Sequence, residues 1–213
     1  MVKPTLILLL VLSNSVPGAF GLNTFNQGQE RLAGYLDQLR SPNPEDRERA
    51  ARGILQLKSK IKDRRDLINA VENIARDFIA DEERAGSAKT AICLLGDLQA
   101  VDSIPFLIEN LTFHVFYKEA KRAQEIGDAH PCSGALIAIA GPSLGPIISK
   151  AEETDDELTN RIASWVVMRI LHGEASAYIQ ERVESQSDEA IQRRLLSMKQ
   201  TIDLWRSTIK GID

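Results

Sequence analysis

The sequence predicts an all-α protein in which about five antiparallel helix pairs stack side by side as an α-solenoid. The main support is a helical phrase of small and apolar residues that recurs four times with one internal spacing. Successive copies end 31 to 45 residues apart, the length of one helix–turn–helix unit. Apolar positions step by three and four rather than by two, so no strand is expected. The four copies cover residues 50–58, 88–96, 133–141 and 164–172.

The first 21 residues predict a secretory signal peptide. Lys3 supplies a positive start, residues 6–12 form an unbroken apolar run, and small, turn-prone residues follow up to Gly21. This order is typical of a leader, and a buried N-terminal strand or helix is the alternative. The run is shorter than the roughly 20 apolar residues that span a bilayer. We therefore expect a secreted or periplasmic protein, a folded domain over residues 22–213, and no stable membrane span after the leader is removed.

The second helix of each predicted pair has a recognisable start. Asn43 stands before Pro44, a cap residue followed by a proline at the first helical position. Residues 154–157 read as a capping box. Comparable starts occur at Asp81, Pro131 and Ser187. Helix ends are expected at glycines, which readily adopt the left-handed conformation that closes a helix; these are Gly96, Gly141 and Gly173.

The first helices of the pairs lie between these segments. Apolar residues at helical spacing mark them within residues 32–39, 67–78, 104–111, 144–150 and 178–183. A last helix over about residues 187–209 is expected to cap the stack, because a terminal repeat covers the end of the core. The unit with the longest spacing contains an insertion at about residues 112–130, which we expect to form a loop on one edge.

Three segments resemble HEAT repeats, in particular the short bacterial kind that also occurs in phycobilisome-lyase-like proteins. They read DRERAARGILQL, SAKTAICLLGDLQAVDSIPFLIENL and ALIAIAGPSLGPIISKAE. Arg47, Ala50 and Leu55 match the family pattern Arg-x-x-Ala-x-x-x-Leu, whereas the fourth copy departs from it with His172 in place of glycine. The resemblance covers about residues 28–185 and implies stacked helix pairs. It implies no single function, since HEAT arrays include scaffolds, adaptors and a few enzymes.

Composition and motifs argue against several classes of function. The formal net charge is −4, whereas a nucleic-acid-binding protein is expected to be basic, so no nucleic-acid partner is predicted. The resemblance raises the di-iron hydroxylases of the HEAT type, which use repeated His-Glu pairs. His114, His130 and His172 are never followed by Glu, so this arrangement is not matched. We recognise no catalytic constellation and predict no metal and no cofactor.

The insertion supplies the first candidate residues for binding a partner. Phe113, Phe116 and Tyr117 stand close together and are followed by Lys118. Insertions in repeat proteins map to loops on one edge, frequently the binding edge. Three of the nine Phe and Tyr residues cluster here, which favours an anchor for a protein partner. The alternative is that these aromatic side chains complete the preceding helix and fold back onto the core.

A second candidate surface involves Trp165 and Arg169, which are one helical turn apart. In the alignment of the repeats, Trp165 occupies the position of Lys89, beside a small core residue and toward the inner face of the stack. The resemblance to HEAT arrays implies that this inner, concave face binds partners, so Lys89, Trp165 and Arg169 are predicted to contact one. Trp and Arg are also enriched at interface hot spots. The alternative is a buried Trp165 and an Arg169 that only pairs with a nearby carboxylate.

The two cysteines are predicted to be free, buried thiols. Cys93 and Cys132 are offset by six residues in the repeat alignment, about 9 Å along a helix. Neighbouring helices pack about 8–10 Å apart, whereas a disulfide needs Cα atoms within about 7 Å. A bridge remains the alternative, because exported proteins meet oxidising conditions.

These observations predict an exported HEAT-like scaffold or adaptor that binds a protein partner through its concave face and its inserted edge loop, without catalysis. A chromophore-lyase-like enzyme or assembly factor of the HEAT type is the alternative. A HEAT protein that acts on nucleic acid is a third interpretation, disfavoured by the charge and the leader. A broad open groove would favour binding, whereas a deep pocket with converging ionisable groups would favour catalysis.

Overall fold

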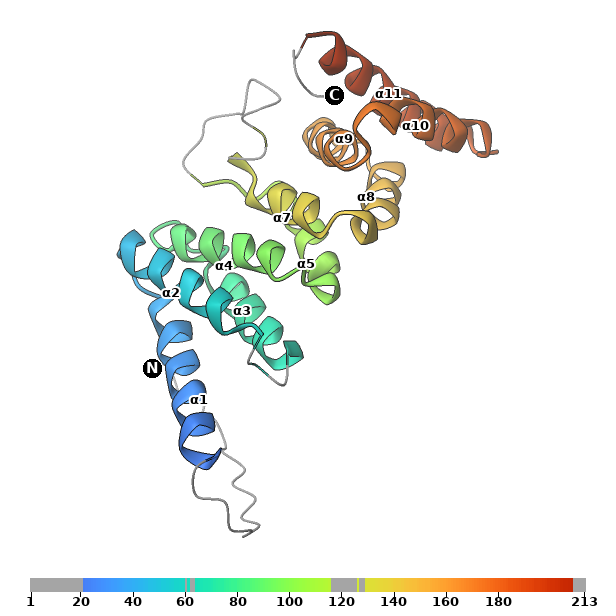
Figure 1. Ribbon diagram of the computed structural model, residues 1–213. Helices are drawn as coiled ribbons and strands as arrows, with labels where there is room; N and C mark the ends of the chain where they lie inside the picture. Colours follow the sequence, from blue (N-terminus) through green and yellow to red (C-terminus); the bar gives the residue numbers. More distant parts are fainter. Residues whose placement is uncertain (1–20, 60, 62–63, 116–125, 127–128, 209–213) are drawn as a thin grey trace.

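The structure is a computed structural model that describes residues 21–59, 61, 64–115, 126 and 129–208 (Figure 1). The described residues are helical and contain no strand, which confirms the predicted all-α class. The predicted leader lies outside the described residues, apart from its last residue. The α-helices are α1 Gly21–Gln38, α2 Pro44–Leu57, α3 Arg64–Phe78, α4 Ala85–Asp97, α5 Ile104–Glu109, α7 Pro131–Ile139, α8 Gly141–Glu153, α9 Glu157–Leu171, α10 Ala175–Glu184 and α11 Glu189–Thr208, with short 3-10 turns η1 Val101–Ser103 and η2 His172–Glu174.

The helices follow one another from α1 at one end to α10 and α11 at the other (Figure 1). Helices adjacent in sequence contact each other, as α3 does α4 and α10 does α11. Contacts also run through α2, α4, α7, α9 and α11 in succession, each helix touching the next in that series. The buried apolar side chains form one continuous cluster from Leu39 to Ile202.

Helices α4 and α7 approach each other closely. A Cβ atom added to Gly96 would lie 2.8 Å from the Cα of Ala135, which is shorter than real Cβ contacts. Residue 96 therefore permits this contact because it has no side chain. Gly96 lies inside α4 and is buried, so its role differs from the expected one of ending the helix.

The expectation that Gly96, Gly141 and Gly173 hold left-handed positions is wrong. Positive φ occurs instead at Gln99, Ala140 and His172, one residue or two beyond the ends of α4, α7 and α9. After α4, the N–H of Gln99 donates to the carbonyl of Gly96 and that of Ala100 to the carbonyl of Leu95, the hydrogen-bond pattern of a Schellman motif.

The corners after α7 and α9 share one strained conformation. Ala140 has φ 65° and ψ −129°, and His172 has φ 49° and ψ −126°. Only glycine adopts these angles readily, yet in both corners the glycine is the next residue in the chain. At each corner the N–H of the strained residue donates to a carbonyl four residues earlier, that of Leu136 or Met168.

The structure confirms one predicted helix start and shifts another by two residues. Asn43 caps α2 as expected, because its side-chain oxygen accepts from the N–H of Glu45 at 3.0 Å. The cap of α9 is Asp156, which accepts from the N–H of Thr159 at 2.7 Å. Thr154 instead accepts from the N–H of Asp156 and shapes the turn before the cap.

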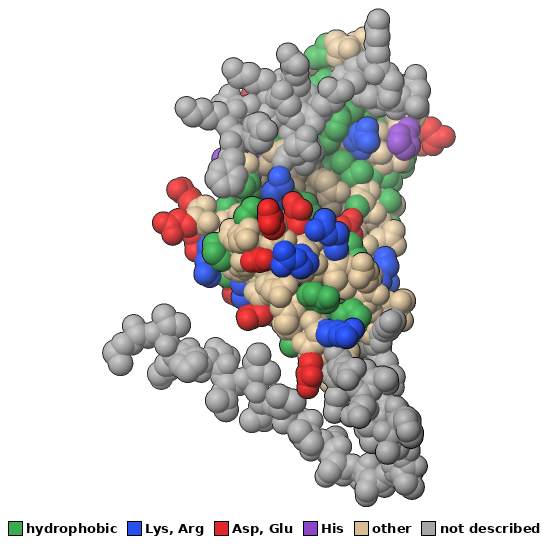
Figure 2. Space-filling model, turned by 60° about the vertical axis from the view of Figure 1, so that its left-hand side comes forward, with side chains coloured by type: hydrophobic (Ala, Val, Ile, Leu, Met, Phe, Trp, Pro, Cys, Tyr) green, Lys and Arg blue, Asp and Glu red, His purple; other side chains and the backbone are tan. Residues whose placement is uncertain are grey.

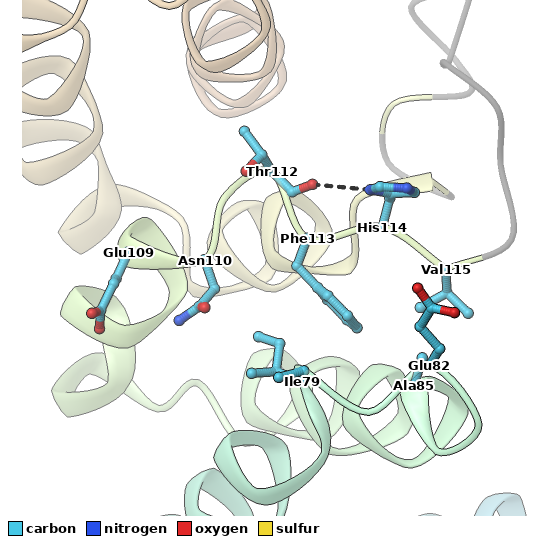
Figure 3. Close-up of a pocket in the computed structure, with 10 residues that line it drawn as sticks. Ile79, Glu82, Ala85, Glu109, Asn110, Thr112, Phe113, His114 and Val115 are labelled. Atoms are coloured by element: carbon cyan, nitrogen blue, oxygen red, sulfur yellow. Dashed lines mark hydrogen bonds between the residues drawn. The ribbon is translucent and has the colours of Figure 1, made fainter.

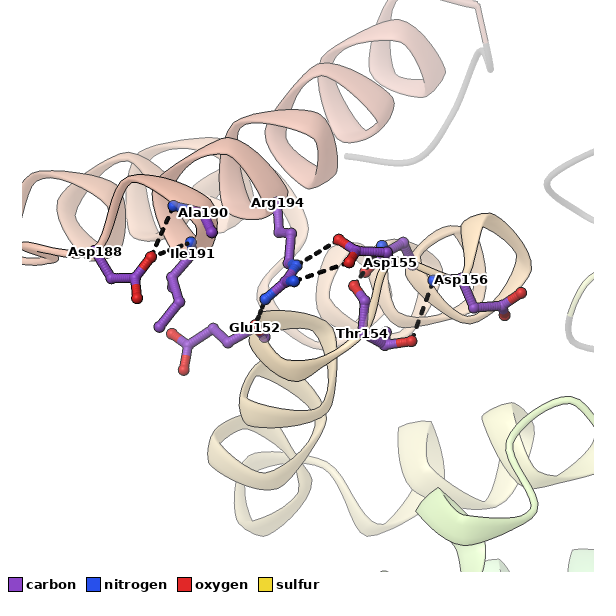
Figure 4. A network of polar contacts seen from close by, with 9 residues as sticks. Glu152, Thr154, Asp155, Asp156, Asp188, Ala190, Ile191 and Arg194 are labelled. Atoms are coloured by element: carbon purple, nitrogen blue, oxygen red, sulfur yellow. Dashed lines mark hydrogen bonds and ion pairs between the residues drawn. The ribbon is translucent and has the colours of Figure 1, made fainter.

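The C-terminal helix α11 is tied to the turn between α8 and α9 by a network of charges (Figure 4). Arg194 donates to both carboxylate oxygens of Asp155, at 2.6 and 2.9 Å, and to the backbone carbonyl of Glu152 at 2.7 Å. The carboxylate of Glu152 accepts from Arg182 of α10 at 2.8 Å. The Arg194 guanidinium lowers the pKa of Asp155 below its usual value by hydrogen bonding to the carboxylate.

Candidate functional site

A cavity of about 830 Å³ lies at the edge of the molecule where the insertion begins, and we call it the edge pocket (Figure 3). Two segments form its walls. The first is the turn from α3 into α4, which contributes Ile79, Ala80, Glu82 and Ala85. The second is the end of α5 and the chain that follows it, which contributes Glu109, Asn110, Thr112, Phe113, His114 and Val115.

Local hydrogen bonds fix both walls of the edge pocket. On the first, the side chain of Asp81 accepts from the N–H groups of Glu83 and Arg84, at 3.1 and 3.2 Å. Asp81 was expected to cap the helix, but α4 begins only at Ala85, so it stabilises the preceding turn instead. On the second wall, the side-chain amide of Asn110 donates to the carbonyl of Phe106 at 2.9 Å.

The charged groups of the edge pocket are carboxylates. Glu82 and Glu109 line it, and no Lys or Arg is among its described lining residues. Figure 3 shows the two carboxylates on opposite sides, with Ile79 and Phe113 between them. The two carboxylates therefore do not converge on one point.

Two histidines that are 16 residues apart in sequence meet beside the edge pocket. The rings of His114 and His130 are 6.2 Å apart between centroids, in an edge-to-face arrangement. His130 is buried, and its Nδ1 lies 3.3 Å from the carbonyl oxygen of Phe113. Burial lowers the pKa of His130, and the nearby His114 and Arg161 lower it further. The contact between the His130 ring and the Phe113 carbonyl thus joins the two ends of the insertion.

The structure describes four of the seven residues predicted to bind a partner, Lys89, Phe113, Trp165 and Arg169. Phe113 is half-buried and lines the edge pocket. Phe116, Tyr117 and Lys118 lie outside the described residues. Lys89 is exposed on α4, and Arg169 is exposed on α9.

Trp165 is 5% exposed, so its side chain contributes to the core rather than to an open face. Its ring packs edge-to-face against Trp205 of α11, with 6.0 Å between the centroids. Arg169 covers the ring from outside, with its guanidinium carbon 5.5 Å from the centroid. Of the predicted Trp–Arg pair, Arg169 is the member that α9 offers to solvent.

The expectation that both cysteines are buried is wrong for Cys93. Cys132 is fully buried, whereas Cys93 lies on the exposed stripe of α4 with Lys89 and Asp97. The pKa values of both thiols are raised, in each case first because the surrounding protein desolvates the sulfur. Lys89 opposes this effect at Cys93. Neither thiol is therefore activated as a nucleophile.

The sequence interpretation missed one short motif. Residues 141–145 read Gly-Pro-Ser-Leu-Gly, which matches the Gly-x-Ser-x-Gly string of nucleophile elbows. An elbow needs a strand, a sharp turn and a helix that expose the serine. Ser143 instead lies in the first turn of α8, is fully buried, and follows helix α7. The string does not form a catalytic site here.

The described residues fit neither the role of metal ligands nor that of membrane spans. No group of three or more His, Cys, Asp or Glu side chains in them is placed to hold a metal ion. None of their helices is long and apolar enough to cross a membrane.

No family model, curated protein or solved structure matches this chain.

Proposed function

We propose that this chain is an exported helical scaffold that binds a protein partner at the edge pocket. In this proposal about five helix pairs stack as a HEAT-like α-solenoid. The contacts that run through α2, α4, α7, α9 and α11 support that arrangement, because in stacked pairs each second helix touches the next. The core that continues from Leu39 to Ile202 supports it as well.

The observation that carries the binding role is the cavity of about 830 Å³ beside the insertion. A cavity of this size, lined by both apolar and polar side chains, is typical of a binding site. Phe113 lies within it, at the start of the segment that carries the other predicted aromatic residues. A partner would place a side chain on Phe113 and extend along the edge of the helix stack.

The test is quantitative capture of partners from the envelope or medium of the exporting cell. Wild-type protein and the variants Phe113→Ser and Leu204→Ser are compared by mass spectrometry. Leu204 is the control, because it is 60% exposed on α11, away from the edge pocket. We expect one protein to be captured by the wild type and by the Leu204 variant but to be lost at least about tenfold with Phe113→Ser, the loss expected for a hot-spot residue. Equal capture by all three would refute this site.

A further inference from the structure

The edge pocket combines an apolar centre with a negatively charged rim. Ile79 and Phe113 form the centre, Glu82 stands on one side, and Glu109 stands on the other (Figure 3). The two carboxylates come from different segments, one from the turn before α4 and one from the end of α5. Their separation across the apolar centre is therefore set by the packing of the fold.

The carboxylate of Glu109 is only weakly neutralised. Its ion pair is with Arg76 at 3.9 Å, and its side chain is 71% exposed. Arg76 is held more closely by Glu72, at 2.7 Å, and stacks over the ring of Phe106 at 4.4 Å. Because Arg76 is engaged elsewhere, a positive charge from outside can approach Glu109.

Glu82 is also open to a cation. It is exposed, and no ion pair to it occurs within the described part of the chain. Asp81 and Glu83 flank it in the same turn and outnumber the one cation there, Arg84, which stacks over the ring of Phe78, so the net charge on this side is negative. Figure 2 shows acidic and basic side chains interspersed on the face of the molecule that it presents, which contrasts with the absence of Lys and Arg from the described lining of the edge pocket.

We infer that the edge pocket binds a protein segment in which an apolar residue is flanked by lysine or arginine. This inference rests on the proposed function and specifies the chemistry of its partner. The apolar side chain packs on Ile79 and Phe113, and the two cationic side chains pair with Glu82 and Glu109. An acidic segment would be repelled from the same rim, so the charges select partners as well as attract them.

The experiment is a selection from a random peptide library displayed on phage, with the purified full chain immobilised as the target. We expect enriched peptides to carry Lys or Arg on both sides of a Leu, Ile, Phe or Met. Each substitution Glu82→Gln and Glu109→Gln should weaken a selected synthetic peptide about two- to fivefold, and the double variant about tenfold, as exposed charge pairs do. The double variant Glu174→Gln/Glu181→Gln, at exposed positions near α10, is the matched control and should bind as the wild type does.

The outcomes separate the ligand chemistry from the proposed function. Peptides that need Phe113 but carry no basic residue, or that bind the Glu82/Glu109 double variant unchanged, would overturn the basic segment and leave the edge pocket as a binding site. A selection that yields no peptide sensitive to Phe113→Ser would overturn both. Enrichment of flanking basic residues, lost in the Glu82/Glu109 double variant and kept in the matched control, supports the inference. These two variants alter exposed side chains, so the test does not depend on a change in the core.

Discussion

The edge pocket and the C-terminal end of the molecule both gather carboxylates, but the two regions use arginine differently. At the C-terminal end, Glu152 and Asp155 are each held by an arginine within 2.8 Å, and these contacts join α8, α10 and α11. At the edge pocket, Glu109 has only the distant Arg76, and Glu82 has no ion pair among the described residues.

Carboxylate side chains have different surroundings in the two regions. A carboxylate that is hydrogen-bonded to a neighbouring helix stabilises the contact between the helices. A carboxylate left beside an apolar cavity contributes little to the fold, yet it remains available to a charged partner. The arginine pairs of the C-terminal network therefore join helices, whereas Glu82 and Glu109 are the carboxylates with which the proposed basic segment would pair.

The largest expected effect comes from removing one arginine in each region. Arg182→Met leaves the carboxylate of Glu152, which is 11% exposed, without its partner. We expect a loss of about 1–2 kcal/mol in the free energy of unfolding, after allowing for the exposed half of Arg182. Arg76→Met keeps an apolar group over Phe106 and removes the 3.9 Å pair with Glu109 together with the 2.7 Å pair with Glu72, and it should cost about 0.5 kcal/mol because the close pair is an i,i+4 pair within one helix. Urea unfolding measures both, and equal losses would break the comparison.

A second effect concerns the two strained corners that precede α8 and α10. Ala140→Gly and His172→Gly should each raise the free energy of unfolding by about 1 kcal/mol, because glycine adopts the observed angles without strain. Ala138→Gly, at an exposed position inside α7, is the control and should lower it by about 1 kcal/mol. A loss at either corner would show that the strain is relieved by a contact of the native side chain.

A third effect separates the two regions by pH. His130 has a lowered pKa, so the unfolded chain takes up its proton first, and stability falls as the pH drops below about 6.5 and through the lower folded value. Asp155 has a lowered pKa as well, so its contribution is complete above about pH 3.8 and is lost as the pH falls through its lower folded value. His130→Gln should remove the first loss and Asp155→Asn the second, as followed by urea midpoints at a series of pH values. If both variants lose stability with falling pH as the wild type does, His130 and Asp155 are not the groups responsible.

The smallest effect is the sharpest check on the role of the edge pocket. The double variant Glu82→Gln/Glu109→Gln should change the free energy of unfolding by no more than about 0.5 kcal/mol, because both side chains are exposed and poorly paired. Thermal unfolding followed by circular dichroism measures this. A clear loss would mean that these carboxylates support the fold, and the contrast with the C-terminal network would disappear.

The sequence predicted the helices well because their signals are local. Spacing of apolar residues marks each helix, and Asn43 and Pro131 mark starts that the structure reproduces. The left-handed corners were misplaced because the rule looks for glycine, whereas the geometry of the turn places positive φ at Gln99, Ala140 and His172. Gly96 instead lies where α4 contacts Ala135 of α7, at a position with no room for a side chain.

The candidate site was predicted only in part, because it depends on contacts between distant segments. The insertion pointed to Phe113, but nothing local in the sequence indicated that Glu82 would face it across a cavity. The meeting of His114 and His130 depends on how the ends of the insertion close, which no helical periodicity encodes. Trp165 was assigned to the inner face by aligning the repeats, and a shift of one residue in such an alignment turns a helix position by about 100°.

Ala140 and His172 form two backbone turns of the same kind. Both enter the next element with the same backbone angles and with a glycine immediately after. Helices α8 and α9 are therefore bounded on both sides by the same kind of backbone turn, so the chain leaves this helix pair with the local geometry with which it entered.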